Sequence, residues 1–339
     1  MRGKRRKERM ILKNATLHIG NGEVFQGDMR IADGKIVEVG KNINGDESRS
    51  LNGKHVFPGF IDSGNFLGAQ DMAFFAKDYN ENSNPVTPYL DIWHSIDPDE
   101  LSLQELYKAG ITSMLVTPGN EGILGGTCTV VKTKGKNINK ITVKRDAAMK
   151  ASMTSEVIRV FSGKGSPQTP MALIAMLKTA LQTTEYANDY RSQRTKEVMD
   201  AVREGRMPIL VACETAPEME RFLEATKEYT KMKIIFTLSY EADRCADAIK
   251  KRGAAVVLGD TSRNATHLVH RMDFAKLMNM AEDGTKVGLT VLGPNMAWGR
   301  EMLLWNASKL MQTCTNSEEI VSMLTVNPAE FFGVSDRIG

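Results

Sequence analysis

Apolar runs that alternate with helical stretches fill most of the chain after Pro58-Gly59, and this pattern constrains the fold more than any other feature. Several runs are apolar without alternation, which is typical of strands covered on both faces. The stretches between them repeat apolar residues about every 3.6 positions, as amphipathic helices do. The runs are 56–61, 111–116, 128–132, 209–212, 234–238, 254–258 and 287–291, and the helical stretches are 101–109, 171–186, 217–229, 241–252 and 274–283.

This alternation predicts parallel βαβ units, and their number favours an α/β fold, a TIM-type (β/α)8 barrel over residues 57–339. The pattern does not identify the eighth strand. Residues 133–170 interrupt the rhythm because they hold several glycines, prolines and lysines. We expect them to form an excursion over the barrel mouth. Residues 186–206 are polar and charged, and they predict an exposed helix.

A small β unit precedes the barrel at residues 11–56. Asn21-Gly22 and Asp33-Gly34 are turn signals of the kind that join short strands into hairpins. Residues 1–10 form a basic tail, which we expect to be solvated. No apolar run follows the tail, so it does not have the pattern of a secretory signal peptide.

Composition indicates which classes of partner the protein can bind and in which cellular compartment it is expected. The formal net charge of +3 is too small to indicate a nucleic-acid-binding surface. No stretch is long and apolar enough to span a membrane, so we expect no membrane partner. The four cysteines are widely separated and form no CxxC pair, which argues against a zinc ribbon or a disulfide framework. Reduced thiols of this kind indicate a cytoplasmic protein.

A set of short motifs follows a definite order along the chain. They are I-A-D-G-K-I at 31–36, V-F-P-G-F-I-D at 56–62, N-P-V-T-P at 84–88, I-D-P-D at 96–99, A-G-I-T at 109–112, G-G at 125–126, V-K-T at 131–133 and T-V-N-P-A-E at 325–330. Each motif alone is weak evidence. Their order and spacing resemble the amidohydrolase superfamily, and its imidazolonepropionase-related subgroup, over about residues 11–339.

The resemblance implies hydrolysis of C–N bonds in amides, lactams, ureas or cyclic imides by water activated on a divalent metal. The family's ligands are His and Asp residues at the carboxyl ends of barrel strands, a set that suits zinc, manganese or iron. In this chain the matching positions are largely degenerate. They hold Gly64, Phe66, Ala212, Glu214, Leu238, Leu292 and Gly293.

Only Glu214 keeps a donor atom among these positions, and one carboxylate does not hold a catalytic metal against water. We therefore expect no metal or other cofactor, and zinc only under an alternative in which the metal site is displaced. The remaining catalytic candidates are Glu214, Cys213 and Asp260. A nucleophilic Cys213 would need a base and a lowered pKa, and a buried structural cysteine is the plainer alternative.

Five residues are candidates for binding a small molecule. Ser262 and Arg263 resemble part of a T-S-R motif of the subgroup, in which the guanidinium would clamp an anionic ligand; helix capping is the alternative for Ser262. Gly125 and Gly126 make a glycine-dense loop that lacks the G-K-[ST] of a phosphate-binding loop, so we expect it to shape a pocket. Lys132 is a polar anchor, a carboxylated ligand or an ordinary structural lysine.

Two functions remain open from the sequence. The first is a pseudoenzyme that keeps the barrel and has a binding, regulatory or assembly role, for example beside an active homologue. The second is an active hydrolase of non-peptide C–N bonds in a cyclic amide or imide. The resemblance also implies further strands after residue 339 that complete a sandwich with residues 11–56. Without them we expect a partner or a second copy to cover the edges, unless the chain is a fragment.

Overall fold

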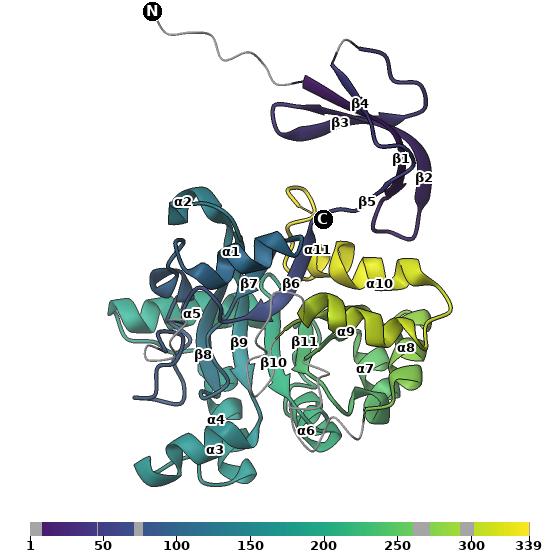
Figure 1. Ribbon diagram of the computed structural model, residues 1–339. Helices are drawn as coiled ribbons and strands as arrows, with labels where there is room; N and C mark the ends of the chain where they lie inside the picture. The colour runs from purple at the N-terminus through teal and green to yellow at the C-terminus, as the bar shows by residue number, and fades with distance from the viewer. Residues whose placement is uncertain (1–8, 46, 71–76, 260–271, 292–301, 339) are drawn as a thin grey trace, which may run out of the picture. The chain divides into compact units, whose positions relative to one another are not determined.

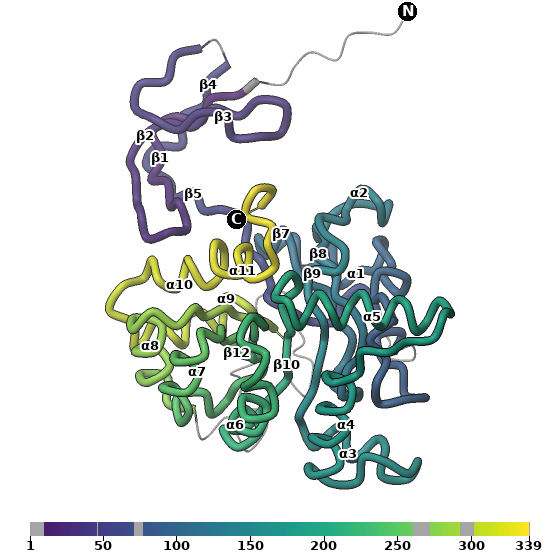
Figure 2. Tube along the Cα trace, turned by 180° about the vertical axis from the view of Figure 1, so that it is seen from behind, coloured from purple at the N-terminus to yellow at the C-terminus, as the bar shows by residue number. Residues whose placement is uncertain are grey.

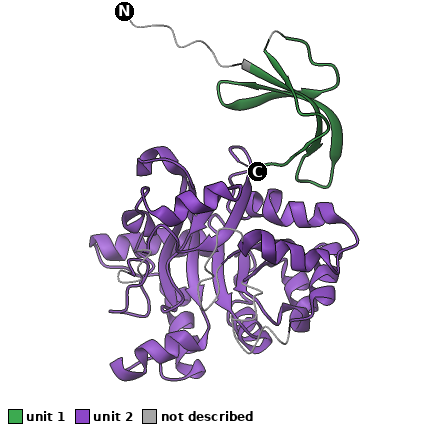
Figure 3. Cartoon of the chain, viewed as in Figure 1, with its two compact units in different colours: residues 1–58 green, residues 59–339 purple. Residues whose placement is uncertain are grey.

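The computed structural model divides the chain into two compact units, residues 1–58 and 59–339 (Figure 3). It describes residues 9–45, 47–70, 77–259, 272–291 and 302–338. Among these residues no helix combines the length and the apolar character needed to cross a membrane. The predicted fold class, an α/β barrel with a separate small β unit before it, is confirmed.

The first unit is a five-stranded sheet with the order β3-β2-β1-β4, in which β5 also pairs with β1. Asp33 and Gly34 connect β2 to β3 as a two-residue turn with φ angles of 51° and 75°. Positive φ at both positions matches the twist of a tight hairpin, so this turn signal is confirmed. The buried core of this first unit consists of Ala15, Leu17 and Met29. The strands are β1 (Arg9–His18), β2 (Val24–Ala32), β3 (Lys35–Gly40), β4 (Ser48–Ser50) and β5 (His55–Val56).

The second unit is built on an eight-stranded sheet whose spatial order follows the sequence from β6 to β13 (Figure 1). This is the strand order of a TIM-type barrel. Each apolar run predicted after Pro58 overlaps one of its strands. The strands are β6 (Phe60–Asn65), β7 (Ile111–Val116), β8 (Leu124–Lys132), β9 (Thr142–Ser152), β10 (Ile209–Cys213), β11 (Ile234–Leu238), β12 (Ala255–Leu258) and β13 (Val287–Leu289).

Strand β8 runs against both of its neighbours, whereas the sequence pattern predicted parallel strands throughout. It pairs antiparallel with β7 and with β9, while the other neighbouring pairs are parallel. The connection at residues 117–123 is too short for a parallel crossover, which needs roughly a dozen residues or more. The segment from β7 to β9 is therefore an antiparallel meander inserted in the barrel.

The prediction that residues 133–170 form an excursion over the barrel mouth is wrong for residues 142–152. These residues form β9, which is the eighth barrel strand that the apolar pattern did not identify. Its first half carries Lys144, Arg145 and Asp146, which interrupt the apolar run by which strands were recognised. The rest of the segment forms short helices on either side of β9.

Helices cover the outside of the barrel (Figures 1 and 2). At the start of α4 the Thr169 hydroxyl accepts a hydrogen bond from the Ala172 N–H, and Pro170 occupies the first turn. The predicted exposed helix at 186–206 is α5, although Val198 and Val202 on one face are buried. The α-helices are α1 (Leu101–Lys108), α2 (Ile138–Ile141), α3 (Ser155–Phe161), α4 (Pro170–Gln182), α5 (Tyr190–Arg203), α6 (Ala216–Ala225), α7 (Ala246–Arg252), α8 (Phe274–Glu282), α9 (Met302–Met311), α10 (Ser317–Leu324) and α11 (Val326–Phe331), with 3-10 turns at Ile92–Ser95, Ser162–Lys164 and Ala242–Cys245.

The lumen of the barrel is filled with apolar side chains at its amino-terminal end. Side chains from strands on opposite sides of a barrel can meet only in its interior, and one apolar cluster draws on every strand from β6 to β12. Ala329, Phe332 and Val334, in and after α11, join the cluster, and the Lys144 amine donates to the Phe332 carbonyl at 2.7 Å near the start of β9. The strand residues are Ile61, Leu115, Cys128, Val130, Val143, Ala147, Ala148, Leu210, Ile235 and Val257.

The seam between β13 and β6 is joined by a carboxylate. Within the described residues no backbone ladder connects these two strands. Asp62 of β6 is fully buried and accepts hydrogen bonds from the Gly64 N–H (3.0 Å), the Thr290 hydroxyl (2.7 Å) and the Val291 N–H (3.1 Å). Burial raises the pKa of Asp62, and hydrogen bonds from Gly64, Thr290, Val291 and Asn65 oppose that effect. The Thr290 hydroxyl also lies 2.8 Å from the Gly64 carbonyl oxygen, so the side chains of Asp62 and Thr290 together link the first barrel strand to the last.

Candidate functional site at the carboxyl ends of the barrel strands

Gly64 and Phe66, the positions where the resemblance predicts a pair of histidines, lie at the end of β6. Gly64 has φ 143°, and a Cβ added there would lie 3.3 Å from side-chain carbons of both Leu210 and Thr117. A larger side chain would therefore be strained and crowded against the lumen. Phe66 is buried and stacks on Tyr79 with ring centroids 3.9 Å apart. An aromatic pair occupies the space of the second predicted ligand.

Ala212 and Leu238, the next two degenerate positions, are also buried. Ala212 pairs in register with Ser152 and with Thr237, so it lies in the layer of the lumen next to the mouth. Leu238 ends β11 with φ 71°, and Ser239 follows with φ 39°. Consecutive non-glycine residues in the left-handed region are costly and persist only where surrounding packing holds them. Leu292 lies outside the described residues.

The residues at these positions do not fit a divalent metal. Glycine, alanine, leucine and phenylalanine offer no side-chain donor, whereas zinc sites need at least three nitrogen, oxygen or sulfur ligands from the protein. Among the residues that the structure describes, no three His, Cys, Asp or Glu side chains form a group able to hold a metal ion.

Glu214 is the one degenerate position that keeps a carboxylate. It follows β10 directly, is half-buried, and its backbone N–H donates to the Glu218 carboxylate at 2.6 Å. Burial raises the pKa of Glu214 to about 7, with smaller contributions from the charges of Glu218 and Glu156. A carboxyl with this pKa can take up or release a proton near neutral pH.

Cys213 precedes Glu214 and is fully buried in the apolar layer around the barrel. Burial raises the pKa of the Cys213 thiol well above its ordinary value, and the nearby Glu218 adds to the effect. A thiol that stays protonated is a poor nucleophile, so these surroundings fit the structural alternative for Cys213. Asp260, the third catalytic candidate, lies outside the described residues.

Lys150 of β9 is a buried polar residue that the sequence analysis missed. It has 0% exposure and pairs in register with Gly126 of β8 and Leu210 of β10, which places its side chain on the lumen face. Within the described residues its Nζ has no hydrogen-bond partner. Burial lowers the pKa of Lys150 to about 8, although Cys128 and Cys213 partly oppose this effect. Its sequence signal is a lysine enclosed by apolar residues in A-A-M-K-A.

Further polar atoms without partners lie on strands around the mouth of the same lumen. The hydroxyls of Thr117, Thr237 and Ser239 are buried and form no hydrogen bond within the described residues. Thr237 belongs to β11, and Thr117 and Ser239 follow β7 and β11 directly. Buried polar groups normally have partners, so this concentration of exceptions marks the site.

Gly125 and Gly126 lie at the start of β8, next to the end of β9, so the structure brings them near Lys150. A Cβ on Gly125 would lie 3.8 Å from the Lys150 Cγ. Gly126 has φ 111°, and a Cβ there would lie 2.7 Å from the Leu90 carbonyl oxygen. Glycine at 126 is therefore required by close backbone packing. A ligand-binding role for the two glycines stays a prediction.

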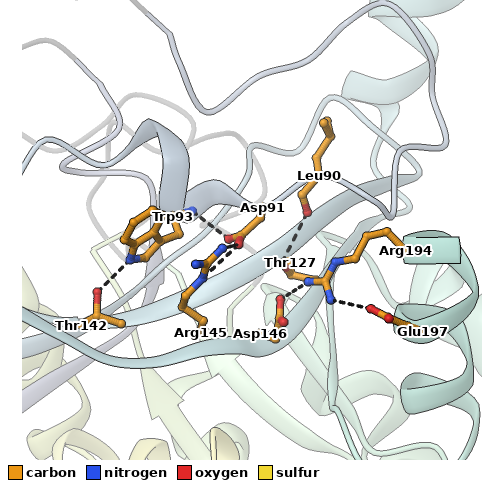
Figure 4. Close-up of polar contacts among 9 residues, drawn as sticks. All are labelled: Leu90, Asp91, Trp93, Thr127, Thr142, Arg145, Asp146, Arg194 and Glu197. Carbon is orange, nitrogen blue, oxygen red and sulfur yellow. Dashed lines mark hydrogen bonds and ion pairs between the residues drawn. The ribbon is translucent and has the colours of Figure 1, made fainter. Parts of the chain in front are cut away.

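The chain that packs on Gly126 is held to β8 and β9 by hydrogen bonds and an ion pair (Figure 4). The Thr127 N–H donates to the Leu90 carbonyl at 2.8 Å, and the Trp93 indole donates to the Thr142 hydroxyl at 2.9 Å. Arg145 forms an ion pair with Asp91 and lies over the Trp93 ring. These contacts fix the backbone at Leu90 against Gly126.

We expect Gly126→Ala to lower the free energy of unfolding by about 1–3 kcal/mol, because an L-residue is strained at this φ and its Cβ overlaps Leu90. Urea denaturation measures the change. Gly125→Ala is the matched control: its Cβ would meet Pro118 at 3.3 Å and its φ is ordinary, so a smaller loss is expected. Equal losses in the two variants would contradict this account.

The structure does not bring Lys132 together with the other candidates. Lys132 ends β8, and because β8 is antiparallel its partner is Ser113, near the start of β7. Lys132 is exposed at the amino-terminal end of the barrel, opposite the mouth. Ser262 and Arg263 lie outside the described residues, so their predicted roles stay predictions.

Comparisons with known proteins bear on the fold. The sequence matches no protein-family model and no curated protein. The structure is similar to that of an amidohydrolase from Thermotoga maritima, with a TM-score of 0.87 and 23% identity over 97% of this chain and 90% of that one. It is also similar to a molinate hydrolase, with a TM-score of 0.52 and 13% identity over 98% and 87% of the two chains. At these identities the similarity establishes a shared fold.

Proposed function

We propose that the chain is an amidohydrolase-superfamily protein, related to imidazolonepropionases, that has lost metal-dependent hydrolysis and acts by binding. The observation that carries the proposal is the occupation of four expected ligand positions by Gly64, Phe66, Ala212 and Leu238. Glu214 alone cannot hold a catalytic ion. The stacking of Phe66 on Tyr79 supports the proposal, because it puts hydrocarbon where an ion would need ligands.

The binding role takes one of two forms in this proposal. The barrel mouth accepts a small molecule, or the barrel serves as an assembly partner for an active homologue or a second copy. A cytoplasmic location belongs to the same proposal, since none of the four cysteines forms a disulfide. The unpartnered polar atoms around the lumen favour the small-molecule form.

A second candidate function is hydrolysis of a cyclic amide or imide. The observation that favours it is Glu214, whose pKa of about 7 suits a proton acceptor at a barrel mouth. In this candidate the Glu214 carboxylate would take up the proton of the attacking water.

Metal analysis of the purified protein tests the proposal. We expect zinc, manganese and iron well below one ion per chain, no change of melting temperature with a chelator, and no turnover of cyclic imides or lactams. Stoichiometric metal together with chelator-sensitive turnover would overturn the proposal. Turnover that follows the titration of Glu214 would favour the second candidate. Metal content and turnover are measured on the same sample, so the two results together distinguish the two functions.

A further inference from the structure

We propose that Lys150 anchors a carboxylate-bearing small molecule inside the mouth of the barrel. The inference rests on the proposed binding function and names the class of ligand for it. The observation that carries it is a lysine amine with 0% exposure, on the lumen face, with no hydrogen-bond partner among the described residues.

The amine of Lys150 lacks a charge partner in the described part of the chain. An ammonium group carries three donors, and burying it without acceptors is costly. Two nearby thiols, those of Cys128 and Cys213, could in principle supply a negative charge. They stay neutral because burial raises the pKa of each. An anion brought by a ligand would supply the missing acceptor and the missing charge together.

The buried carboxylate at the seam is already committed elsewhere. Asp62 accepts three hydrogen bonds that join β6 to β13, so its oxygens serve the Gly64 and Val291 backbone and the Thr290 hydroxyl. No ion pair between Lys150 and an acidic side chain occurs within the described ranges. The lysine is therefore not the partner of a structural carboxylate there.

The positions of the unpartnered hydroxyls indicate from which end of the barrel a ligand would reach Lys150. Thr237 pairs with Ala212, two residues beyond Leu210, the partner of Lys150, so Thr237 lies nearer to the mouth than the lysine. Thr117 follows β7 at the same end. Leu210 fills the lumen beside Lys150, and Ala148 and the rest of the apolar cluster fill it towards the amino-terminal end. A ligand can meet these polar groups only from the carboxyl ends of the strands, where ligands of such barrels enter.

Charge matching favours a carboxylate over a phosphate. The site offers one lysine, whose single charge balances one carboxylate. A phosphate carries more charge and more acceptors, and it is usually held by several cations or by a run of backbone N–H groups. The neutral hydroxyls of Thr117 and Thr237 can complete the hydrogen bonding of a carboxylate without adding charge.

The test is a titration of the full chain with acetate, propionate and benzoate, and with phosphate, at constant ionic strength, followed by melting temperature and calorimetry. We expect a saturable rise of melting temperature with at least one carboxylate. We expect Lys150→Met to weaken its binding by more than about tenfold, and Lys250→Met, an exposed substitution on α7, to leave it unchanged. Lys150→Gln serves as a second variant that removes the charge and keeps a polar end.

Each outcome decides the proposal. Carboxylate binding that survives in Lys150→Met, or no saturable binding by any of the three carboxylates, overturns it, and so does a preference for phosphate. If Lys150→Met does not fold, reduced binding in a folded Lys150→Gln protein supports the site, and unchanged binding overturns it. If the protein is free of metal but binds no carboxylate, only the lysine site is refuted. If the protein holds metal and still binds a carboxylate through Lys150, only the proposed function is refuted.

Discussion

Asp62→Ala is expected to lower the free energy of unfolding by about 3–5 kcal/mol, the largest effect predicted for this chain. The change removes the acceptor of three buried donors, the Gly64 and Val291 N–H groups and the Thr290 hydroxyl. The two backbone N–H groups are then buried without an acceptor, whereas the Thr290 hydroxyl keeps the Gly64 carbonyl at 2.8 Å, so the joint between β6 and β13 is weakened. Urea denaturation followed by circular dichroism measures the change.

Two variants control this result. Asp62→Asn keeps one acceptor oxygen and removes a charge whose burial is unfavourable, so we expect a smaller loss than for Asp62→Ala. Asp99→Ala replaces an exposed aspartate whose ion pair with Lys136 is long, at 3.8 Å, and should change stability by less than about 0.5 kcal/mol. If Asp62→Ala costs no more than Asp99→Ala, the carboxylate does not hold the seam.

Lys150→Met is expected to raise the free energy of unfolding of the ligand-free protein at pH 7 by about 3 kcal/mol. The pKa of Lys150 falls from 10.5 to about 8 on folding, and each pKa unit corresponds to about 1.4 kcal/mol. Between pH 8 and 10.5 the unfolded chain binds a proton at this residue that the folded chain does not. Above pH 10.5 the amine is neutral in both states and its burial costs the wild type nothing. As the pH falls through 8 the buried amine becomes charged, and the wild type then carries the full loss of stability.

The pH profile separates this account from a general packing effect. We expect the advantage of Lys150→Met to be constant below pH 8 and to shrink steadily from pH 8 towards 10.5. Lys132→Met, an exposed substitution of the same type, should show no such profile. An advantage that does not change with pH would mean that burial of the amine is not its cause. A residue that costs stability in the free protein is typical of a functional site.

The barrel could be predicted from the sequence because its strands are short apolar runs between amphipathic helices. Strand β9 escaped because Lys144, Arg145 and Asp146 occupy its first half, where side chains reach the surface, and Lys150 interrupts its second half. The direction of β8 is not encoded in its apolar pattern, since parallel and antiparallel strands can be equally apolar. The signal that could have revealed it is the helix-free connection at 117–123.

The candidate site was predictable only where motifs anchored it. Gly64 and Phe66 follow the P-G-F-I-D motif directly, and the structure places them at the end of β6. The role of Asp62, which is part of that motif, depends on Thr290, 228 positions away in the sequence. The burial of Lys150 likewise depends on neighbouring strands. Such properties arise from packing between distant segments and leave no local trace.

The order in which the barrel assembles follows from the difference between its meander and its seam. Pairing within residues 111–152 closes short loops, which carries a small entropic cost. Joining Asp62 to Thr290 encloses almost the whole barrel, so that contact has a much higher contact order. We infer that the meander is an early folding nucleus and that the first and last strands dock late. On a ribosome, Asp62 would emerge long before Thr290 and Val291, and water would hydrate its carboxylate until those residues follow.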